Sequence, residues 1–299
     1  MRKLLVFCLF IISLNAYGKL NVVATTHELG WLISQIGAEH VEVTTLLTGM
    51  EDPHYVDAVP SFIQRVANAN LVISVGLGLE SAWLGLVIRR SGNLKVQDQN
   101  GHLEVGKVVD VIKDHQGHID RSMGDVHPEG NPHFWLSPPH MKQAARGITK
   151  FFVTHKKEHE EFFNNNLRTL LNHLDDLESL IFKKLKFLPE NFKVIEYHKE
   201  FGYFFQTFGI NSLDALEEFP GVPPSAGRIA RVSKKAQSKK VNILFASSFH
   251  SHRHLRRFKE LSLGIPYLQH SSMMQESSSK HSYQNFLLSF VDAMKKALD

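Results

Sequence analysis

Beyond its first eighteen residues, the sequence alternates short β-branched apolar runs with segments in which apolar residues recur every three or four positions. The runs at 21–25, 41–47 and 71–76 predict three buried strands. Amphipathic segments at 27–37 and 62–69 predict helices between them. Strands that alternate with helices are typical of βαβ units, so the first half predicts an α/β lobe with a mainly parallel sheet.

The second half follows the same order. Strand-like runs lie at 193–198, 241–247 and 265–268, and helix-like segments lie at 201–208 and 225–237. A second α/β lobe with a mainly parallel sheet is therefore predicted, although the two halves share little residue-level similarity.

A long amphipathic stretch lies between the predicted lobes. Its apolar positions are spaced by three or four residues and fit one helical face: Phe163, Leu167, Leu170, Leu174, Leu177, Ile181 and Leu185. One helix over 155–187 would be roughly 50 Å long at 1.5 Å per residue. The alternative is two helices with a break near 164–166. The predicted division is an N-terminal lobe at 19–154, a linking helix at 155–187 and a C-terminal lobe at 188–299.

The first eighteen residues read as a cleaved export signal. Arg2 and Lys3 precede an apolar run at 4–14, and Ala16-Tyr17-Gly18 resembles a cleavage site. The run is shorter than the roughly 20 residues of a transmembrane helix. Cys8, the single cysteine, lies too early to resemble a lipoprotein acceptor. A soluble, periplasmic protein is expected.

Composition narrows the chemistry. The formal charge of +4 leaves +2 after removal of Arg2 and Lys3, and the remaining basic residues form no stripe of the kind that binds nucleic acid. Eighteen histidines are present, and no cysteine follows the leader. Any metal site in the exported chain must therefore consist of histidine and carboxylate.

Three histidines are candidates for such a site because of their context. His54 and His133 each follow a proline in a loop, and His198 ends a predicted strand, where ligands gather in open α/β sheets. Proline restricts the backbone beside a ligand and reduces the entropy lost on binding. The three lie more than sixty residues apart and form no short-range motif, so the spacing alone leaves a metal site and a structural reading equally open.

Five segments resemble the substrate-binding proteins of zinc and manganese ABC importers, the cluster A-I or TroA-like family. They are DPHYVDAVPS, ANLVISVGLGLESAWL, GDVHPEGNPHFWLSP, EYHKEFGYFFQTFGI and FPGVPPSAGRI, which occur in the family's order over nearly the whole exported chain. The resemblance implies two α/β lobes joined by one long rigid helix, with the metal in the cleft between them. It also implies a monomeric receptor that delivers metal to a permease in the inner membrane, and no catalysis.

The resemblance also implies a set of ligands. His54 and His133 would bind from the N-terminal lobe and His198 from the C-terminal lobe. The family's fourth ligand is an Asp or Glu late in the chain, and the matching stretch YLQHSSMMQESSSKHSY has no Asp. His270 is the preferred fourth ligand, with Glu276 or a water molecule as alternatives.

Imidazole without thiolate favours Zn²⁺ as the transported ion over Mn²⁺, which prefers oxygen donors. His115, His118 and His127 precede His133 and would at most be accessory contacts, with a solvated loop as the favoured reading. Two alternatives stay open for the function. One is a zinc-dependent hydrolase or hydratase with a three-histidine site and bound water. The other is a manganese receptor or adhesin.

Other polar residues receive secondary roles. Glu217 and Glu218 are expected to cap or support a helix, and Asp125 and Glu196 are candidate hydrogen-bond acceptors for ligand imidazoles. The tract of His250, His252 and His254 lies among arginines and is expected on the surface, with His250 within possible reach of a site.

Overall fold

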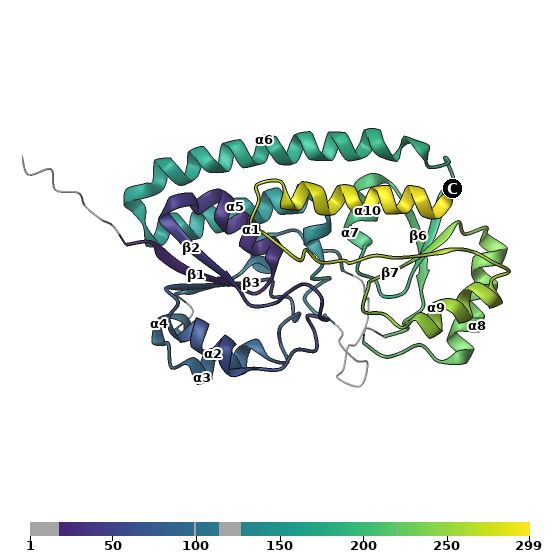
Figure 1. Cartoon of the computed structure of the whole chain (residues 1–299), viewed down its shortest axis with the longest axis horizontal. Coiled ribbons are helices and arrows are strands. Elements are labelled where there is room, and N and C mark those ends of the chain that lie inside the picture. The colour runs from purple at the N-terminus through teal and green to yellow at the C-terminus, as the bar shows by residue number, and fades with distance from the viewer. Residues whose placement is uncertain (1–17, 99, 114–126, 220) are drawn as a thin grey trace, which may run out of the picture.

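The computed structural model describes residues 18–98, 100–113, 127–219 and 221–299 and shows two α/β lobes beneath one long helix (Figure 1). The N-terminal lobe contains β1 (Leu20–Ala24), α1 (His27–Gly37), β2 (Val41–Thr45), α2 (Pro60–Ala67), β3 (Leu71–Ser74), α3 (Leu84–Ser91), α4 (Leu94–Gln97), β4 (His102–Glu104) and α5 (Pro138–His155). The long helix is α6 (Glu160–Lys184). The elements after it are β5 (Lys193–Glu196), α7 (Gly202–Phe208), β6 (Asn211–Ala215), α8 (Ala226–Lys239), β7 (Ile243–Ala246), α9 (His252–Leu261), β8 (Tyr267–Gln269) and α10 (Ser282–Leu298).

The two sheets have the same topology. Their strand orders are β2-β1-β3-β4 and β6-β5-β7-β8, and every pair is parallel. This confirms the predicted fold of two lobes with mainly parallel sheets. The sequence did not predict β4 and β6, because His102–Glu104 has three residues and NSLDA, the sequence of β6, contains three polar ones.

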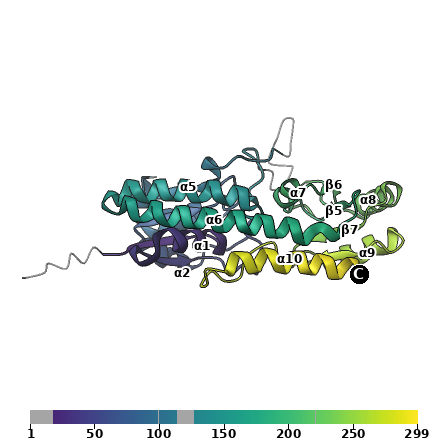
Figure 2. The ribbon, with the colours of Figure 1, turned by 90° about the horizontal axis from the view of Figure 1, so that it is seen from above.

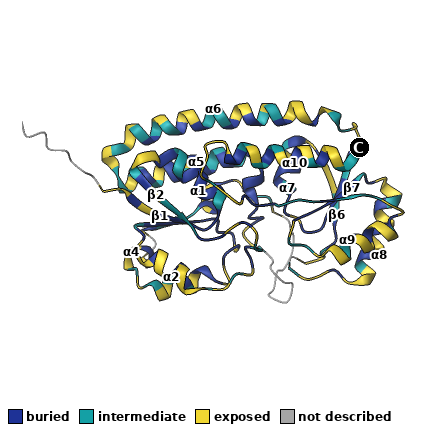
Figure 3. Cartoon of the chain, in the orientation of Figure 1, coloured by how far each residue is buried: buried dark blue, intermediate teal, exposed yellow. Residues whose placement is uncertain are grey.

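Helices cover both faces of the N-terminal sheet. Figure 1 shows α1 and α5 between this sheet and α6, while α2, α3 and α4 lie on its opposite face. In the view from above, α5 and α6 run side by side, with α1 and α10 next to them (Figure 2). Figure 3 shows that buried positions gather in the strands and on the inward faces of these helices, as a layered α/β core requires.

The joining helix is continuous but shorter than the sequence predicts. It has 25 residues, about 37 Å at 1.5 Å per residue. Its buried positions repeat at helical spacing: Phe163, Leu167, Leu170, Leu174, Leu177 and Ile181. The helix starts later than expected because α5 continues to His155 and a 3₁₀ turn, Lys157–His159, follows. The alternative break near 164–166 does not occur.

The chain returns to the N-terminal lobe after β8. Residues 270–281 form a crossing segment that lies against α1, where Trp31 Nε1 donates to the Lys280 carbonyl at 3.2 Å. The Met274 amide donates to Glu28 Oε1 at 2.5 Å, and Tyr283 at the start of α10 stacks on Trp31 with ring centroids 5.0 Å apart. The end of the chain therefore completes the packing of α1, in addition to belonging to the C-terminal lobe.

The predicted export signal lies almost wholly outside the described residues, as does Cys8. Within the described part of the chain, none of the helices combines the length and the apolar character needed to cross a lipid bilayer.

Glu28 gives a prediction about stability. Burial raises the pKa of this carboxyl to about 7, against the lowering effect of its hydrogen bond from the Met274 amide. The pKa of this carboxyl is thus higher in the folded protein than its ordinary value of 4.5. Its contribution to stability is therefore fully present below pH 4.5 and is lost as the pH rises through 7. Glu28→Gln keeps an acceptor for Met274 without the charge. Relative to wild type, we expect this variant to gain up to about 3 kcal/mol in free energy of unfolding between pH 5 and pH 8.

Denaturant unfolding of both proteins at the two pH values measures this difference. Glu39→Gln changes an exposed glutamate just after α1 and serves as the control. A Glu28→Gln difference that is the same at pH 5 and pH 8 would contradict the prediction.

Candidate metal centre

Three imidazoles from distant parts of the chain meet between the lobes. One ring nitrogen from each of His54, His133 and His198 lies within 4.8 Å of the other two, and all three residues are buried. His54 lies in the loop after β2, His133 directly precedes the 3₁₀ turn Phe134–Leu136, and His198 follows β5. They line a cavity of about 80 Å³ whose walls come from both halves of the chain.

The tripeptide Asp52-Pro53-His54 orients the first imidazole. Asp52 Oδ1 accepts from the His54 backbone amide at 3.0 Å and from its Nδ1 at 2.7 Å. The Pro53 carbonyl accepts from Trp83 Nε1 at 3.0 Å, which anchors the loop to the core. A short Asp side chain bonding two residues ahead is a local turn, so the sequence itself fixes this ring.

The tripeptide Asn131-Pro132-His133 repeats this arrangement. Asn131 Oδ1 accepts from the His133 amide at 2.9 Å and from its Nδ1 at 2.8 Å. Asn131 Nδ2 donates to the Lys199 carbonyl at 2.6 Å, next to His198. The same amide thus orients one imidazole and connects its loop to the loop that carries another.

His198 receives its acceptor from another element. Its Nδ1 donates to Glu217 Oε2 at 2.9 Å, and the same oxygen accepts from the Gly221 amide at 3.0 Å. Glu217 follows β6, the strand beside β5, and its own amide donates to the Tyr197 carbonyl at 2.9 Å. The parallel pairing of two strands therefore places the acceptor beside the imidazole.

These hydrogen bonds determine the tautomers. Carboxylate and amide oxygens only accept, so Nδ1 of His54, His133 and His198 carries the hydrogen. In the neutral ring the Nε2 lone pair is then available to a cation. The centre consists of three Nε2 donors, each held by an oxygen on the opposite side of its ring.

The charges around the centre differ between the lobes. Burial, followed by the neighbouring His198 and His54 charges, holds the pKa of His133 well below its usual value. Burial also acts to lower the pKa of His198, but the hydrogen bond and charge of Glu217, with Glu200 and Asp52, raise it to about 9. At neutral pH the metal-free site therefore holds a neutral His133 and a protonated His198.

The preferred fourth ligand lies outside this group. His270 Nδ1 is bonded to the Ser271 carbonyl at 2.9 Å and its Nε2 to Ser289 Oγ at 3.2 Å, and the ring packs against Phe290. Glu276 of the crossing segment accepts hydrogen bonds from Ser278 and from Ser282 at the start of α10. The structure thus does not bring His270 or Glu276 to the three imidazoles.

Two other histidines do lie beside the centre. His127 Nε2 is 3.1 Å from His54 Nε2, while His115 and His118 fall outside the described residues. His250 lines the cavity and stacks on Tyr197 with ring centroids 4.1 Å apart, which agrees with the alternative that it reaches a site and not with the preferred surface position. His252, the next in the tract, is exposed as expected.

Some of the predicted supporting residues make contacts other than those expected. Glu196 accepts from the Phe201 amide and from Ser212 Oγ, and Asp125 lies outside the described residues. Glu217, expected to support a helix, is the acceptor of His198. Ser137 directly precedes α5, but its Oγ bonds to His140 and Thr207 and caps no backbone amide.

The sequence did contain a signal for two of the true acceptors. Both Pro-His pairs are preceded by an Asx residue, so D-P-H and N-P-H are the same unit. Glu200, which lines the cavity and is buried, was also overlooked; it accepts from the Ser247 amide at 3.0 Å.

Comparisons with known proteins agree with this fold. Residues 22–297 match the family described as ZnuA, zinc-uptake complex component A, periplasmic. The manganese ABC transporter substrate-binding lipoprotein PsaA of Streptococcus anginosus is 25% identical over 290 residues, which cover 94% of this chain and 89% of that protein. The high-affinity zinc uptake system protein ZnuA of Bacillus subtilis strain 168 is 23% identical, over 76% of this chain and 70% of its own.

A solved structure has the same fold. The periplasmic zinc-binding protein TroA from Treponema pallidum superimposes with a TM-score of 0.77 and 19% identity, over 94% of this chain and 99% of its own. The family match covers most of the chain and the family comprises solute-binding proteins and not enzymes, as the sequence indicated. The chain therefore belongs to the ZnuA/TroA family of metal-binding substrate-binding proteins of ABC importers.

Proposed function

We propose that this chain is a periplasmic receptor that binds Zn²⁺ between its lobes through His54, His133 and His198 and delivers it to an ABC permease in the inner membrane. The observation that supports this most strongly is the convergence of three imidazoles on one cavity, each with an acceptor at Nδ1 that turns its Nε2 inward. Pre-oriented nitrogens lose little entropy when an ion binds.

The donor atoms favour zinc over manganese. Among the described residues, the group that could hold an ion contains imidazole nitrogens and no carboxylate oxygen. Such donors suit Zn²⁺, whereas Mn²⁺ prefers carboxylate, carbonyl and water oxygens. The relatives include both a manganese protein and a zinc protein, so the donor set carries this part of the proposal.

The cavity favours a bare ion as the ligand. Its volume of about 80 Å³ is well below the 300–1,000 Å³ of typical pockets for organic ligands. Nearly all of its lining is polar or aromatic, and ring nitrogens provide the inward-facing donors. An ion with at most a few waters fits this space.

We also propose how the receptor is divided into segments and where it is located. We assign 1–18 to a cleaved export signal, 19–154 and 188–299 to the lobes and 155–187 to the linking region, in a protein that acts as a monomer. The description of the matched family as periplasmic supports the location, and the helix α6 within 155–187 supports the linking region.

Removal of a ligand tests the site. His54→Ala and His133→Ala should each weaken Zn²⁺ binding by more than about 100-fold, beyond the usual effect of losing an outer hydrogen bond. The measurement is competition with a chromophoric chelator, using protein freed of metal. His155→Ala removes a histidine that bonds to the Phe151 and Asn100 carbonyls at the end of α5 and should leave the affinity unchanged. Wild-type affinity in both ligand variants would refute the proposal.

The pH dependence follows from His198. Its pKa of about 9 in the metal-free protein means that zinc must displace a proton at neutral pH. Affinity should therefore rise about tenfold per pH unit from pH 7 until it levels off near 9. His133, neutral in this range, adds no slope.

Glu217→Gln removes the charge that raises this pKa, so its affinity should depend less steeply on pH between 7 and 9. Binding calorimetry in two buffers of different ionisation enthalpy counts the protons released. An unchanged slope and proton count in the variant would place the displaced proton elsewhere.

The transported ion requires an experiment in cells, because Zn²⁺ outcompetes Mn²⁺ at most nitrogen sites in vitro. In a host without its own zinc and manganese receptors, the chain with its permease should restore growth in zinc-depleted medium and uptake of radioactive zinc. The His133→Ala variant should restore neither. Rescue confined to manganese-depleted medium would contradict the choice of zinc.

A further inference from the structure

His127 faces the centre in the same way as the three proposed ligands. Its Nδ1 is 2.9 Å from the Leu77 carbonyl, and its Nε2 is 3.1 Å from Nε2 of His54. The His127 ring centroid lies 5.2 Å from that of His54 and 6.4 Å from that of His133. The residue is therefore at the edge of the group, next to one of its members.

The contact between the Nε2 atoms of His127 and His54 requires a positive charge between them. A carbonyl only accepts, so His127 Nδ1 carries the hydrogen and its Nε2 has the lone pair. His54 Nε2 also has its lone pair, because Nδ1 donates to Asp52. Two lone pairs that face each other repel unless a proton or a metal cation lies between them. In a tetrahedral zinc site with Zn–N bonds of 2.0–2.1 Å, neighbouring nitrogens are about 3.3 Å apart.

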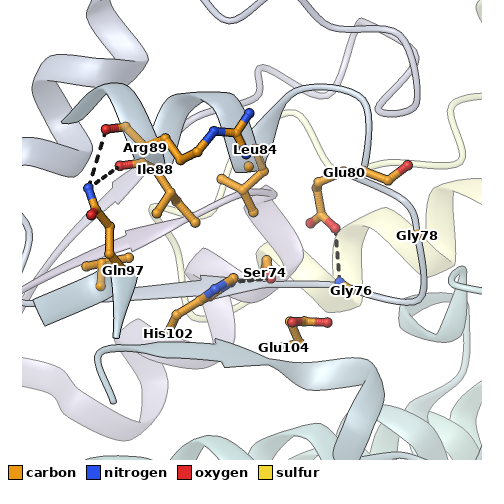
Figure 4. Close-up of a pocket in the computed structure, with 13 residues that line it drawn as sticks. Ser74, Gly76, Gly78, Glu80, Leu84, Ile88, Arg89, Gln97, His102 and Glu104 are labelled. Carbon is orange, nitrogen blue, oxygen red and sulfur yellow. Dashed lines mark hydrogen bonds between the residues drawn. The ribbon is translucent and has the colours of Figure 1, made fainter. Parts of the chain in front are cut away.

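The turn at residues 76–78 holds His127 in place. The carbonyl that accepts from its Nδ1 belongs to Leu77. Leu77 has a φ of 55°, and Gly76 and Gly78 on either side of it also have positive φ. Figure 4 shows Glu80 Oε2 accepting from the Gly76 amide at this turn, and Oε1 of the same buried carboxylate accepts from the Val75 amide. A Cβ at residue 78 would lie 3.2 Å from His127 Nδ1, so glycine leaves room for the ring.

Other candidates for a fourth ligand are less well arranged. His250 Nδ1 accepts from the Ser247 amide at 3.0 Å, so the hydrogen is on Nε2 and that nitrogen has no lone pair to offer. His270, directly after β8, is bonded at both ring nitrogens, to the Ser271 carbonyl and to Ser289 Oγ. Glu200 lines the cavity, but its Oε1 is held by the Ser247 amide, and no oxygen of this carboxylate belongs to the 4.8 Å group.

We propose that His127 is the fourth ligand, so that four Nε2 atoms hold the ion. This deepens the proposed function and rests on it. In the structure His127 contacts His54 but lies outside the 4.8 Å group, so binding requires a small inward movement of its ring, whereas the other three donors are already in position. The late carboxylate expected from the family resemblance is then unnecessary.

Substitutions at 127 separate ligation from a structural role. His127→Asn retains a donor for the Leu77 carbonyl at nearly the position of Nδ1 but has no atom in place of Nε2. His127→Ala removes both. We expect both variants to bind Zn²⁺ at least about 30-fold more weakly than wild type, within the range for perturbing a metal site. His270→Ala should bind as wild type does, and thermal unfolding of the metal-free variants checks that they are folded.

X-ray absorption of the zinc-loaded proteins counts the imidazoles directly. We expect four in wild type and three in His127→Asn. Wild-type affinity and an unchanged imidazole count in His127→Asn would overturn the assignment, as would loss of binding in Glu200→Gln with no effect at 127. If His54→Ala also binds zinc as tightly as wild type, the proposed function itself fails, and the two failures are thus distinguishable.

Discussion

A hydrogen bond on the outer side of each imidazole determines where its inner lone pair points. Asp52, Asn131 and Glu217 each present an oxygen to a ligand Nδ1, at 2.7, 2.8 and 2.9 Å. Because those oxygens cannot donate, each Nδ1 carries a hydrogen, and the three Nε2 atoms face one cavity. Without these bonds either ring nitrogen of each histidine would be free to carry the hydrogen, and the centre would lose its arrangement of donors.

The topology explains why the donors meet. Both sheets are parallel with the same strand order, and the loops after β2 and β5 carry ligands at the carboxyl ends of their strands. The helix α6 and the crossing segment 270–281 both connect the lobes, so the opposing loops are held by two separate connections. The Asn131 hydrogen bond to the Lys199 carbonyl adds a contact at the site itself.

Much of this was predictable, for identifiable reasons. Strand-like runs and the helical spacing of Phe163 to Ile181 are periodic signals, which survive in a single sequence. The D-P-H and N-P-H units are local as well, although only their prolines were recognised. The acceptors Glu217 and Leu77 were not predictable. Glu217 meets His198, 19 residues away, through strand pairing, and Leu77 meets His127, 50 residues away, through a turn. The choice of His270 as a ligand rested on its position late in the chain, and position along the chain does not determine where a side chain points.

The crossing segment bears on the order in which the chain acquires its structure. Trp31 and Glu28 of α1 are fully buried, yet part of their cover comes from Met274, Lys280 and Tyr283. Nearly 250 residues separate the partners, so these contacts of the N-terminal lobe close a very long loop of the chain. A chain that emerges from its N-terminus thus cannot finish its first lobe until its end is available. The native packing of α1 is therefore completed only after the last part of the chain has been made.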